Sequence, residues 1–291
     1  MRVVVTGAAG QLGAELCHLL GPEAVPIDLD RLDLAPAPSV AKTIAELAPD
    51  AVINCAAYTH VDHAESDPRV CRMVNAMAVK YLAEACAKLD CPLVQISTDY
   101  VFSGRPDRAR PYREDEETSA EGVYAVTKRE GERLAAAYPK HLIVRTCGLY
   151  ARPSHAGVRN FVATIRRLGR SRPKLSVVSD QHCTPSYVPH VARAVLFLLG
   201  NADSRPAAWG TYHVTNRGAT TWYDFACEIL RLAGLDCVLE PITTAQYGAA
   251  APRPRYSVLD TSAYHRLGGP EMPEWEQGLA EYFEELKEIE T

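Results

Sequence analysis

The chain has 291 residues, of which 47% are hydrophobic, enough to bury a sizeable core in one large or two modest domains. Its net charge of -5 argues against a general nucleic-acid binder. No apolar run reaches about 18 residues and no charged-then-apolar leader precedes Val3, so neither a membrane span nor a signal peptide is expected.

The first predicted elements are a strand, a tight turn and a helix. Residues 2–7 form a β-branched run that ends in glycine, and apolar residues then recur at helical spacing over 12–20. Glycines in the order G-x-x-G-x-x-G let the backbone turn sharply, approach a pyrophosphate and pack the helix closely on the strand. The residues assigned to a dinucleotide cofactor here are Gly7, Gly10, Gln11, Leu12 and Gly13.

The second predicted strand, 24–27, ends in a carboxylate. Asp28 stands where a ribose-binding acid is expected, about 20 residues after the glycine turn. It favours a free ribose 2'-hydroxyl and hence NADH, whereas Arg31 could neutralise the 2'-phosphate of NADPH, so we expect both cofactors to be used. Asp33 and Leu34 follow and are assigned to the same cofactor site.

Strand-like and helix-like stretches alternate along the first half of the chain. Such an order predicts an α/β fold, a doubly wound parallel (Rossmann) sheet covered on both faces. The remaining predicted strands are 51–54, 93–97 and 141–146, and the predicted helices between them are 39–47, 70–89 and 124–138.

After Tyr150 the alternation loosens, which predicts a smaller C-terminal substrate lobe. The stretches 151–160 and 172–187 are interpreted as loop-rich, and a final helix carries an apolar face that should dock. We expect a dinucleotide-binding domain of residues 1–150 plus about 186–215, and a substrate-binding lobe of about 151–185 plus 216–291.

Three residues predict proton donation to a carbonyl. Thr98 ends a predicted strand, and Tyr124 and Lys128 lie one helical turn apart. A tyrosine titrates near pH 10, and an ammonium on the same helix face favours its phenolate, so Lys128 is expected to lower the pKa of Tyr124. Thr98 would hydrogen-bond the carbonyl while Tyr124 supplies the proton.

Several motifs carry a resemblance to a known family. They are TGAAGQLG (6–13), NCAAYTHVDHAES (54–66), ISTDYVFSG (96–104), YAVTK (124–128) and GATTWYDFA (218–226). With them the chain resembles the extended short-chain dehydrogenase/reductases, most closely the dTDP-4-dehydrorhamnose reductases, from Val3 to about Leu259. The resemblance implies NAD(P)H-dependent reduction of the 4-keto group of dTDP-4-dehydro-L-rhamnose to dTDP-L-rhamnose.

Further site residues are expected at strand ends and at positions that match the family. Small residues after strand 51–54 would let the backbone approach the cofactor, and the set assigned there is Cys55, Ala56, Ala57 and Tyr58. Arg253 matches the family's R-P-x-x-S-x-L segment and could clamp the substrate diphosphate; the alternative is a solvated loop charge. The complete substrate set is Val61, Thr98, Asp99, Tyr100, Asn160 and Arg253.

The chain departs from the family after strand 141–146. Cys147 and Gly148 stand where these reductases usually have Ser and Trp, and the tryptophan is thought to lie against the sugar. Its absence predicts a roomier pocket and broader substrate selection, unless another side chain, such as Tyr100, Tyr150 or Tyr187, fills the space.

No metal is expected. Some family members bind Mg²⁺ between subunits through acidic residues; Glu15 matches one of these, but Pro189 stands where a second carboxylate would be needed. His182 and Cys183 lack a third ligand at recognisable spacing, and the acidic run 114–117 is interpreted as a solvated loop. Nine cysteines without C-x-x-C predict free thiols and a cytoplasmic location.

Alternatives to the reductase stay open. One is a catalytically silent regulatory subunit like that of methionine adenosyltransferase, and another is a nucleotide-sugar epimerase on the same fold. The presence of Thr98, Tyr124 and Lys128 favours an enzyme, because a binding subunit needs no proton donor. The expected partner is a dTDP-linked 4-keto-6-deoxy sugar rather than a nucleic acid or a membrane, and a homodimer is left open.

Overall fold

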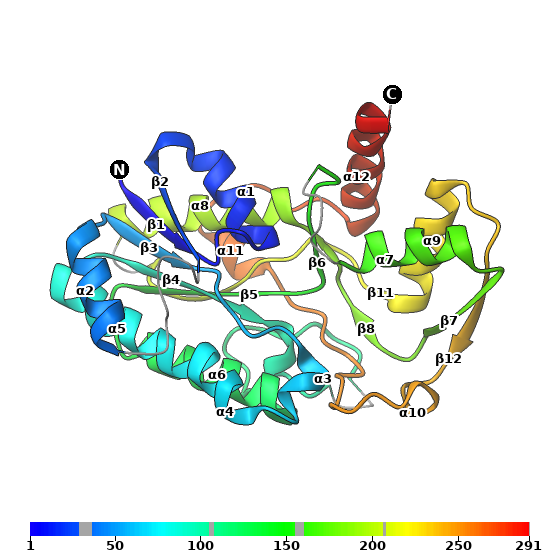
Figure 1. The fold of residues 1–291 in the computed structure, drawn as a ribbon, viewed down its shortest axis with the longest axis horizontal. Coiled ribbons are helices and arrows are strands. Elements are labelled where there is room, and N and C mark those ends of the chain that lie inside the picture. The colour runs from blue at the N-terminus through cyan, green and yellow to red at the C-terminus, as the bar shows by residue number, and fades with distance from the viewer. Residues whose placement is uncertain (29–36, 105–107, 155–159, 206–207, 291) are drawn as a thin grey trace.

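A six-stranded parallel sheet forms the larger part of the molecule (Figure 1). The computed structural model describes residues 1–28, 37–104, 108–154, 160–205 and 208–290. The strand order is β10-β5-β4-β3-β1-β2, with every neighbouring pair parallel. The strands are β1 (Val3–Thr6), β2 (Ala24–Ile27), β3 (Ala51–Asn54), β4 (Leu93–Thr98), β5 (His141–Thr146) and β10 (Gly210–His213).

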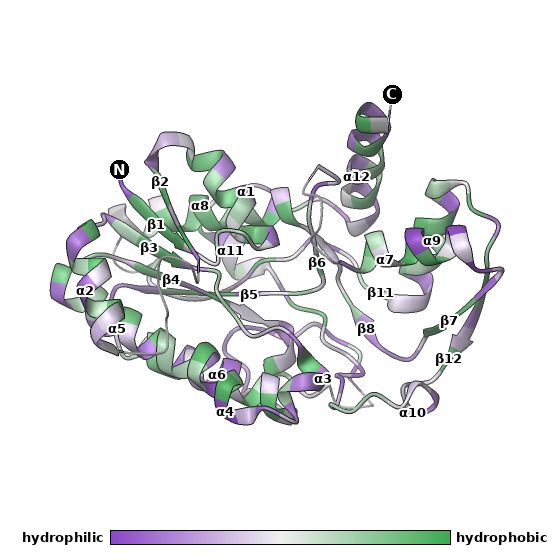
Figure 2. Cartoon of the chain, in the orientation of Figure 1, coloured by the Kyte–Doolittle hydropathy of each residue, from purple (hydrophilic) through white to green (hydrophobic). Residues whose placement is uncertain are grey.

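Alternation along the strands buries both faces of the sheet. In β1, Val3 and Val5 belong to one apolar cluster, while Val4 belongs to the other. The first cluster is covered by α1 (Gln11–Leu20), α8 (Val188–Ser204) and α11 (Ser262–Arg266), and the second by α2 (Ala37–Leu47), α5 (Ala78–Leu89) and α6 (Gly122–Ala136). The α/β doubly wound fold expected from the sequence is confirmed, and apolar strands run through its centre (Figure 2). We call the sheet and these six helices the sheet half.

The predicted helix at 70–89 is longer and interrupted. It begins as α4 (Pro68–Arg72), continues as a π-helical segment η2 (Met73–Met77), and ends as α5. Asp67 caps the start, because its carboxylate accepts the amide of Val70. The wider turn carries a buried residue, Asn75, that reaches the candidate site.

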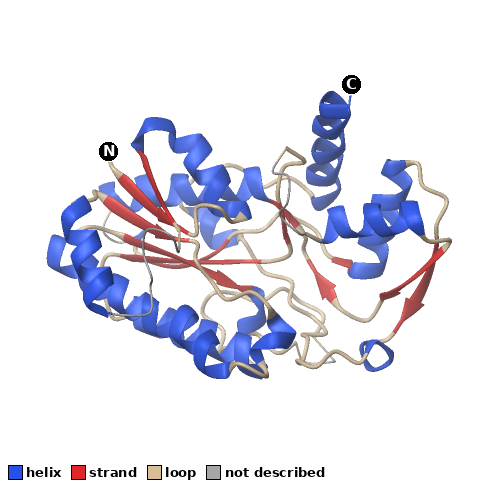
Figure 3. Ribbon diagram, viewed as in Figure 1, coloured by secondary structure: helices blue, strands red, loops and turns tan. Residues whose placement is uncertain are grey.

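A smaller group of elements, which we call the lobe, lies to one side of the sheet (Figures 1 and 3). An aromatic cluster binds helices α7 (Phe161–Ser171), α9 (Trp222–Ala233) and α12 (Trp275–Glu290) together. Parallel strands β7 (Lys174–Val178) and β12 (Val238–Ile242) flank them. Leu279, Tyr282 and Phe283 of α12 are buried in this cluster, as the apolar face of the last helix predicted.

Stretches interpreted as loop-rich contain short strands that join the two halves. Beyond β7, these are β8 (His182–Cys183), paired with β11 (Thr220–Thr221), and β9 (Ser186–Tyr187), paired with β6 (Leu149–Tyr150). Remaining short elements are η1 (Gly21–Glu23), α3 (Val61–Ala64), η3 (Asp99–Val101) and α10 (Thr244–Tyr247). Within the described ranges, no helix has the length and apolar character needed to cross a membrane.

Candidate active site

The glycine turn between β1 and α1 is packed so tightly that it excludes side chains. Gly7 has a φ of +65°, and a Cβ there would lie 2.7 Å from the amide nitrogen of Ala56. A Cβ on Gly13 would lie 2.2 Å from the carbonyl oxygen of Gly7. Helix α1 starts at this turn with no side-chain cap and no acid in its first turn, so its amides can receive an anion. These features fit a dinucleotide pyrophosphate.

Other predicted cofactor residues also shape this turn. Asp28 Oδ2 accepts the amide of Ala9 at 2.7 Å, so the carboxylate fastens the turn as well as facing the end of β2. Leu12 is a core residue, and Gln11 Oε1 accepts the amide of Ala151 at 2.8 Å, which ties the turn to the segment after β6. Three further predicted residues, Arg31, Asp33 and Leu34, lie outside the described residues.

Buried polar side chains link strands β1, β3 and β4 through hydrogen bonds. Thr6 Oγ1 donates to Asn54 Oδ1 at 2.5 Å, and Asn54 Nδ2 donates to Gln95 Oε1 at 2.7 Å. The predicted residues Cys55, Ala56, Ala57 and Tyr58 continue from β3 beside the glycine turn.

Asn75 is a residue of this site that the sequence analysis missed. Its Oδ1 accepts the amide of Tyr58 at 2.9 Å, and its Nδ2 donates to Thr127 Oγ1 at 3.3 Å. It thereby fixes the chain after β3 against helix α6. The Asn75 side chain reaches Tyr58 and Thr127 because it lies in a π-helical turn. The sequence analysis searched for α-helical periodicity, which does not reveal a π-helical turn.

Thr98 and Tyr124 come together at the carboxyl end of β4. An interaction with the Thr98 side chain lowers the pKa of Tyr124, but desolvation dominates and raises it. Tyr100 packs edge-to-face on the Tyr124 ring with centroids 5.8 Å apart. A phenol with a raised pKa is protonated at neutral pH, which is the form a proton donor requires.

The predicted effect of Lys128 on Tyr124 needs correction. Lys128 is buried on the same face of α6, but its Nζ donates to the carbonyl oxygen of Ile96 at 2.7 Å. It is not among the main groups that shift the pKa of Tyr124, whereas burial lowers the pKa of Lys128 itself to about 8. The carbonyl oxygen of Ile96 competes with Tyr124 for the ammonium of Lys128, and the spacing of residues in the sequence cannot show this contact.

Asp99 is a buried carboxylate immediately beside Thr98. Its Oδ1 accepts from Thr98 Oγ1 at 3.1 Å, and its Oδ2 accepts from the Cys147 thiol at 3.0 Å. Burial raises the pKa of Asp99, although hydrogen bonds from Ser257, Cys147 and Thr98 oppose this. Asp99 therefore joins β4 to the segment after β5 and to Ser257.

Another side chain fills the space at Gly148, so the exception to the roomier pocket applies, and broader substrate selection stays a prediction. Gly148 has a φ of +54°, and a Cβ there would lie 3.1 Å from Pro185 Cα and 3.2 Å from Trp222 Cη2. Of the three tyrosines proposed to fill the space, Tyr150 and Tyr187 are buried in the lobe core and Tyr100 packs on Tyr124. A residue from α9 occupies the position instead.

The remaining predicted substrate residues lie at the boundary between the halves. Arg253 donates to Asp62 Oδ2 at 2.9 Å and to the carbonyl oxygen of Ala251 at 3.0 Å, so it is neither a solvated loop charge nor wholly free for a ligand. It lies near enough to Tyr100 to lower the pKa of that phenol, although burial raises it more. Asn160 caps α7 through its Oδ1, and Val61 begins α3.

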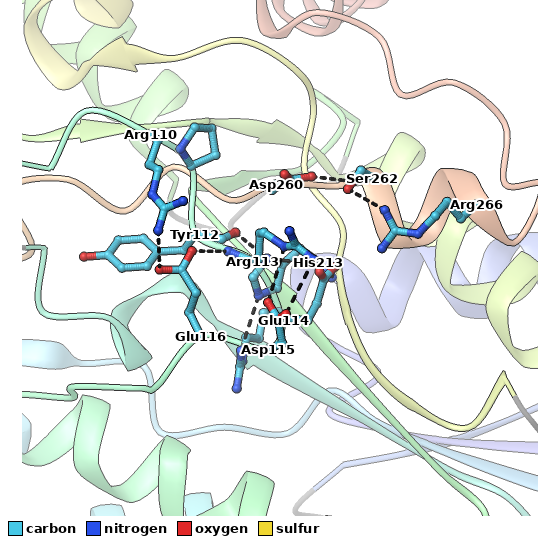
Figure 4. Close-up of polar contacts among 12 residues, drawn as sticks. Arg110, Tyr112, Arg113, Glu114, Asp115, Glu116, His213, Asp260, Ser262 and Arg266 are labelled. Carbon is cyan, nitrogen blue, oxygen red and sulfur yellow. Dashed lines mark hydrogen bonds and ion pairs between the residues drawn. The ribbon is translucent and has the colours of Figure 1, made fainter.

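Only part of the acidic run 114–117 is the solvated loop that was expected: Asp115 and Glu117 are exposed, whereas Glu114 and Glu116 have partners (Figure 4). Glu114 Oε1 accepts the amide of His213 at 3.0 Å, and burial raises the pKa of Glu114. Glu116 forms a two-point ion pair with Arg108, which lowers the pKa of Glu116 to about 2. Glu114 thus holds the segment against β10, and Glu116 ties the segment to Arg108.

An arginine neutralises the carboxylate that matches the family's metal site. Glu15 is fully buried, and Arg152 donates to its two oxygens at 2.9 and 3.1 Å and also to Glu285 of α12. An internal cation therefore stands between these two acids. Among the described residues, no group of three or more His, Cys, Asp or Glu side chains is arranged to hold a metal ion.

The parallel sheet, the glycine turn and the Thr98–Tyr124–Lys128 arrangement define a short-chain dehydrogenase/reductase, an NAD(P)-dependent oxidoreductase. Residues 1–288 match the family described as the RmlD substrate binding domain, and the chain belongs to that family.

Comparisons with individual proteins agree. The chain is 41% identical to a dTDP-4-dehydrorhamnose reductase of Streptomyces griseus over 98% of this chain and 94% of that protein. It is similar to the crystal structure of such a reductase from Clostridium acetobutylicum (TM-score 0.91, 39% identity, 99% and 100% of the two chains). It is also similar to one from Bacillus anthracis in complex with NADP (TM-score 0.90, 37% identity, 100% and 99% of the two chains).

Proposed function

We propose that this protein reduces the 4-keto group of dTDP-4-dehydro-L-rhamnose to a hydroxyl, giving dTDP-L-rhamnose. The observation that carries the proposal is the pairing of Thr98 with a protonated Tyr124 at the end of β4, at the same edge of the parallel sheet as the glycine turn after β1. The similarity of almost the whole chain to named dTDP-4-dehydrorhamnose reductases supports the choice of substrate.

We propose NADPH and NADH as alternative cofactors, bound in the assigned positions. Gly7, Gly10 and Gly13 would admit the pyrophosphate, and Asp28 would face the adenine-side ribose. Thr146 Oγ1, a buried hydroxyl without a partner within the described ranges, lies opposite Thr98 in the β4–β5 register and offers a further polar contact. The cofactor supplies the hydride for C4.

In the proposed reaction, Tyr124 protonates the oxygen that gains negative charge as the hydride arrives. Thr98 would turn its hydroxyl proton from Asp99 Oδ1 to the same oxygen and keep that oxygen close to the phenol. Lys128, buried on α6 and held by the carbonyl of Ile96, would bind the hydroxyls of the nicotinamide ribose.

The sheet half and the lobe are proposed to bind different ligands. Residues 1–150 with about 186–215 would hold the cofactor, and about 151–185 with 216–291 would hold the sugar nucleotide. Arg253, already turned toward Asp62, would exchange part of that contact for the substrate diphosphate. The other substrate positions are Val61, Asp99, Tyr100 and Asn160.

We also propose a cytoplasmic homodimer. All nine cysteines are free, which supports a reducing compartment. Val70 of α4 and Val126 of α6 are exposed apolar side chains on neighbouring helices and would suit a subunit contact. The molecular mass in solution tests this part, and a monomer at micromolar concentration would contradict it.

The function is tested by following NADPH and NADH oxidation against a panel of dTDP- and UDP-linked 4-keto sugars. We expect turnover with dTDP-4-dehydro-L-rhamnose and a stable dTDP-L-rhamnose product. NADPH binding without oxidation of any sugar would favour the silent binding subunit, and interconversion of C4 epimers without net cofactor use would favour an epimerase.

A further inference from the structure

Trp222 lies where a side chain on residue 148 would otherwise be. Its Cη2 is 3.2 Å from the position of a Gly148 Cβ. Gly148 follows Cys147, whose thiol donates to Asp99, and Asp99 is bonded in turn to Thr98. The indole tip is therefore only a few side chains away from the proton-donating pair, although its helix belongs to the lobe.

The indole of Trp222 is positioned by the N-termini of helices α9 and α7. Trp222 is the first residue of α9, whose cap Thr221 accepts the amide of Asp224 at 3.0 Å. Its ring packs on Phe161, the first residue of α7, with centroids 4.7 Å apart and planes inclined by 49°. Both rings pack against the buried lobe core, yet both keep part of their surface exposed.

We propose that Trp222, supported by Phe161, is the aromatic surface on which the sugar ring of the substrate rests. This inference rests on the proposed function, and it names a specificity-determining residue for that site. Gly148 has no side chain, so the indole of α9 can reach the segment after β5 without a clash.

The chemistry of a 4-keto-6-deoxy sugar suits such a surface. The carbonyl replaces one hydroxyl and the C6 methyl replaces a hydroxymethyl group, so one side of the ring presents mostly C–H groups. An aromatic side chain can bury on the order of 150 to 250 Å² against such groups. A hydroxymethyl group pressed on the same ring would lose its water partners, which is the basis for discrimination against 6-hydroxy sugars.

Kinetics of Trp222→Phe and Trp222→Leu test the proposal, with Trp209→Phe, directly before β10 in the sheet half, as the matched control. We expect Trp222→Leu to raise the KM for the 4-keto-6-deoxy sugar on the order of tenfold, with Trp222→Phe in between. The NADPH dissociation constant and the melting temperature of Trp222→Phe should stay at wild-type values. An unchanged sugar KM in a folded Trp222→Leu variant would overturn the proposal.

Tryptophan fluorescence gives a readout that does not depend on turnover. The chain has three tryptophans, so removing one leaves an interpretable signal. Titration with dTDP-L-rhamnose should quench wild-type and Trp209→Phe protein but have little effect on Trp222→Phe, whereas dTDP alone should give a small response in all three. An equal sugar-dependent response in Trp222→Phe would contradict the stacking.

The same titration separates this inference from the proposed function. If wild-type protein reduces no dTDP-linked sugar, the proposed function fails. Trp222 is then tested independently by quenching with UDP-linked sugars: a sugar-dependent signal lost in Trp222→Phe would still support the aromatic surface. A signal retained in that variant would reject it.

Discussion

The sheet half and the lobe are stabilised by different kinds of contact. In the sheet half, buried polar side chains form continuous chains of hydrogen bonds between strand ends and helix α6. The lobe core is instead a cluster of aromatic rings, in which the Tyr150 hydroxyl is buried without a partner within the described ranges. A hydrogen-bonded network needs a matched donor and acceptor at every position, whereas an aromatic core accepts substitution by apolar side chains of similar volume. We therefore expect the sheet half to hold the catalytic groups, and the lobe to be the part whose side chains can change to suit a different substrate.

Removal of one tyrosine hydroxyl from each half should give the largest contrast. General acid catalysis typically contributes about 10² to 10⁴-fold, so Tyr124→Phe should lose that much kcat while binding NADPH normally. Tyr150→Phe removes a hydroxyl that has no hydrogen-bond partner among the described residues, and it should keep wild-type kcat and stability. Single-turnover rates and cofactor titrations measure both. Near wild-type turnover in Tyr124→Phe would reject its role.

Removal of one arginine from each half should separate buried from exposed ion pairs. Arg145 and Glu132 are 7% and 6% exposed, and Glu132 also accepts from Ser97 at 2.6 Å. Arg145→Met leaves a buried charge and should cost about 3 to 5 kcal/mol in the free energy of unfolding. Arg217 of the lobe is 40% exposed and its partners Glu271 and Glu274 are 72% and 47% exposed, so Arg217→Met should cost about 1 kcal/mol or less. Urea unfolding measures the free energy of unfolding of both variants. Equal losses in Arg145→Met and Arg217→Met would contradict the difference between buried and exposed ion pairs.

The buried amine of Lys128 should make stability depend on pH. Its pKa is about 8 in the folded protein against an ordinary value of 10.5, so between these pH values the unfolded chain binds more protons. Stability from this group therefore rises with pH across that window, by on the order of 3 kcal/mol, and the gain is absent below it.

Unfolding between pH 7.5 and 10.5 measures this effect. Lys128→Met should lack that part of the rise, because the neutral side chain has no charge to bury. Lys174→Met, at an exposed site on β7 of the lobe, should keep the wild-type profile. The assignment fails if Lys128→Met and wild type show parallel pH profiles.

The smallest difference between two paired variants is expected at Cys147, where the halves meet. Cys147→Ala removes a donor from the buried carboxylate of Asp99 and should cost about 1 to 3 kcal/mol in stability. Cys147→Ser keeps a donor at the same place and should cost clearly less. The order of the two melting temperatures is the measurement, and a reversed order would show that packing of the sulfur outweighs its hydrogen bond.

The contrast between the halves also explains what the sequence could predict. All five strands expected in the first 150 residues form, because β-branched runs and glycine turns are local signals. The two-residue strands of the junction were missed, since they exist only through pairing with distant segments. Thr98, Tyr124 and Lys128 could be selected from their motifs, but the partners of Lys128 and the neighbour of Gly148 depend on tertiary contacts. The roles of the selected residues stay predictions.

The position of β10 has a consequence for how the chain is made. β10 pairs with β5, although about half the lobe's elements lie between them in the sequence. On a ribosome, the edge of β5 emerges long before its neighbour, and an unpaired strand edge invites contact with other chains. Closure of the sheet therefore waits for residues 210–213, and nascent chains stopped before that point should associate or recruit chaperones, whereas chains released after it should not.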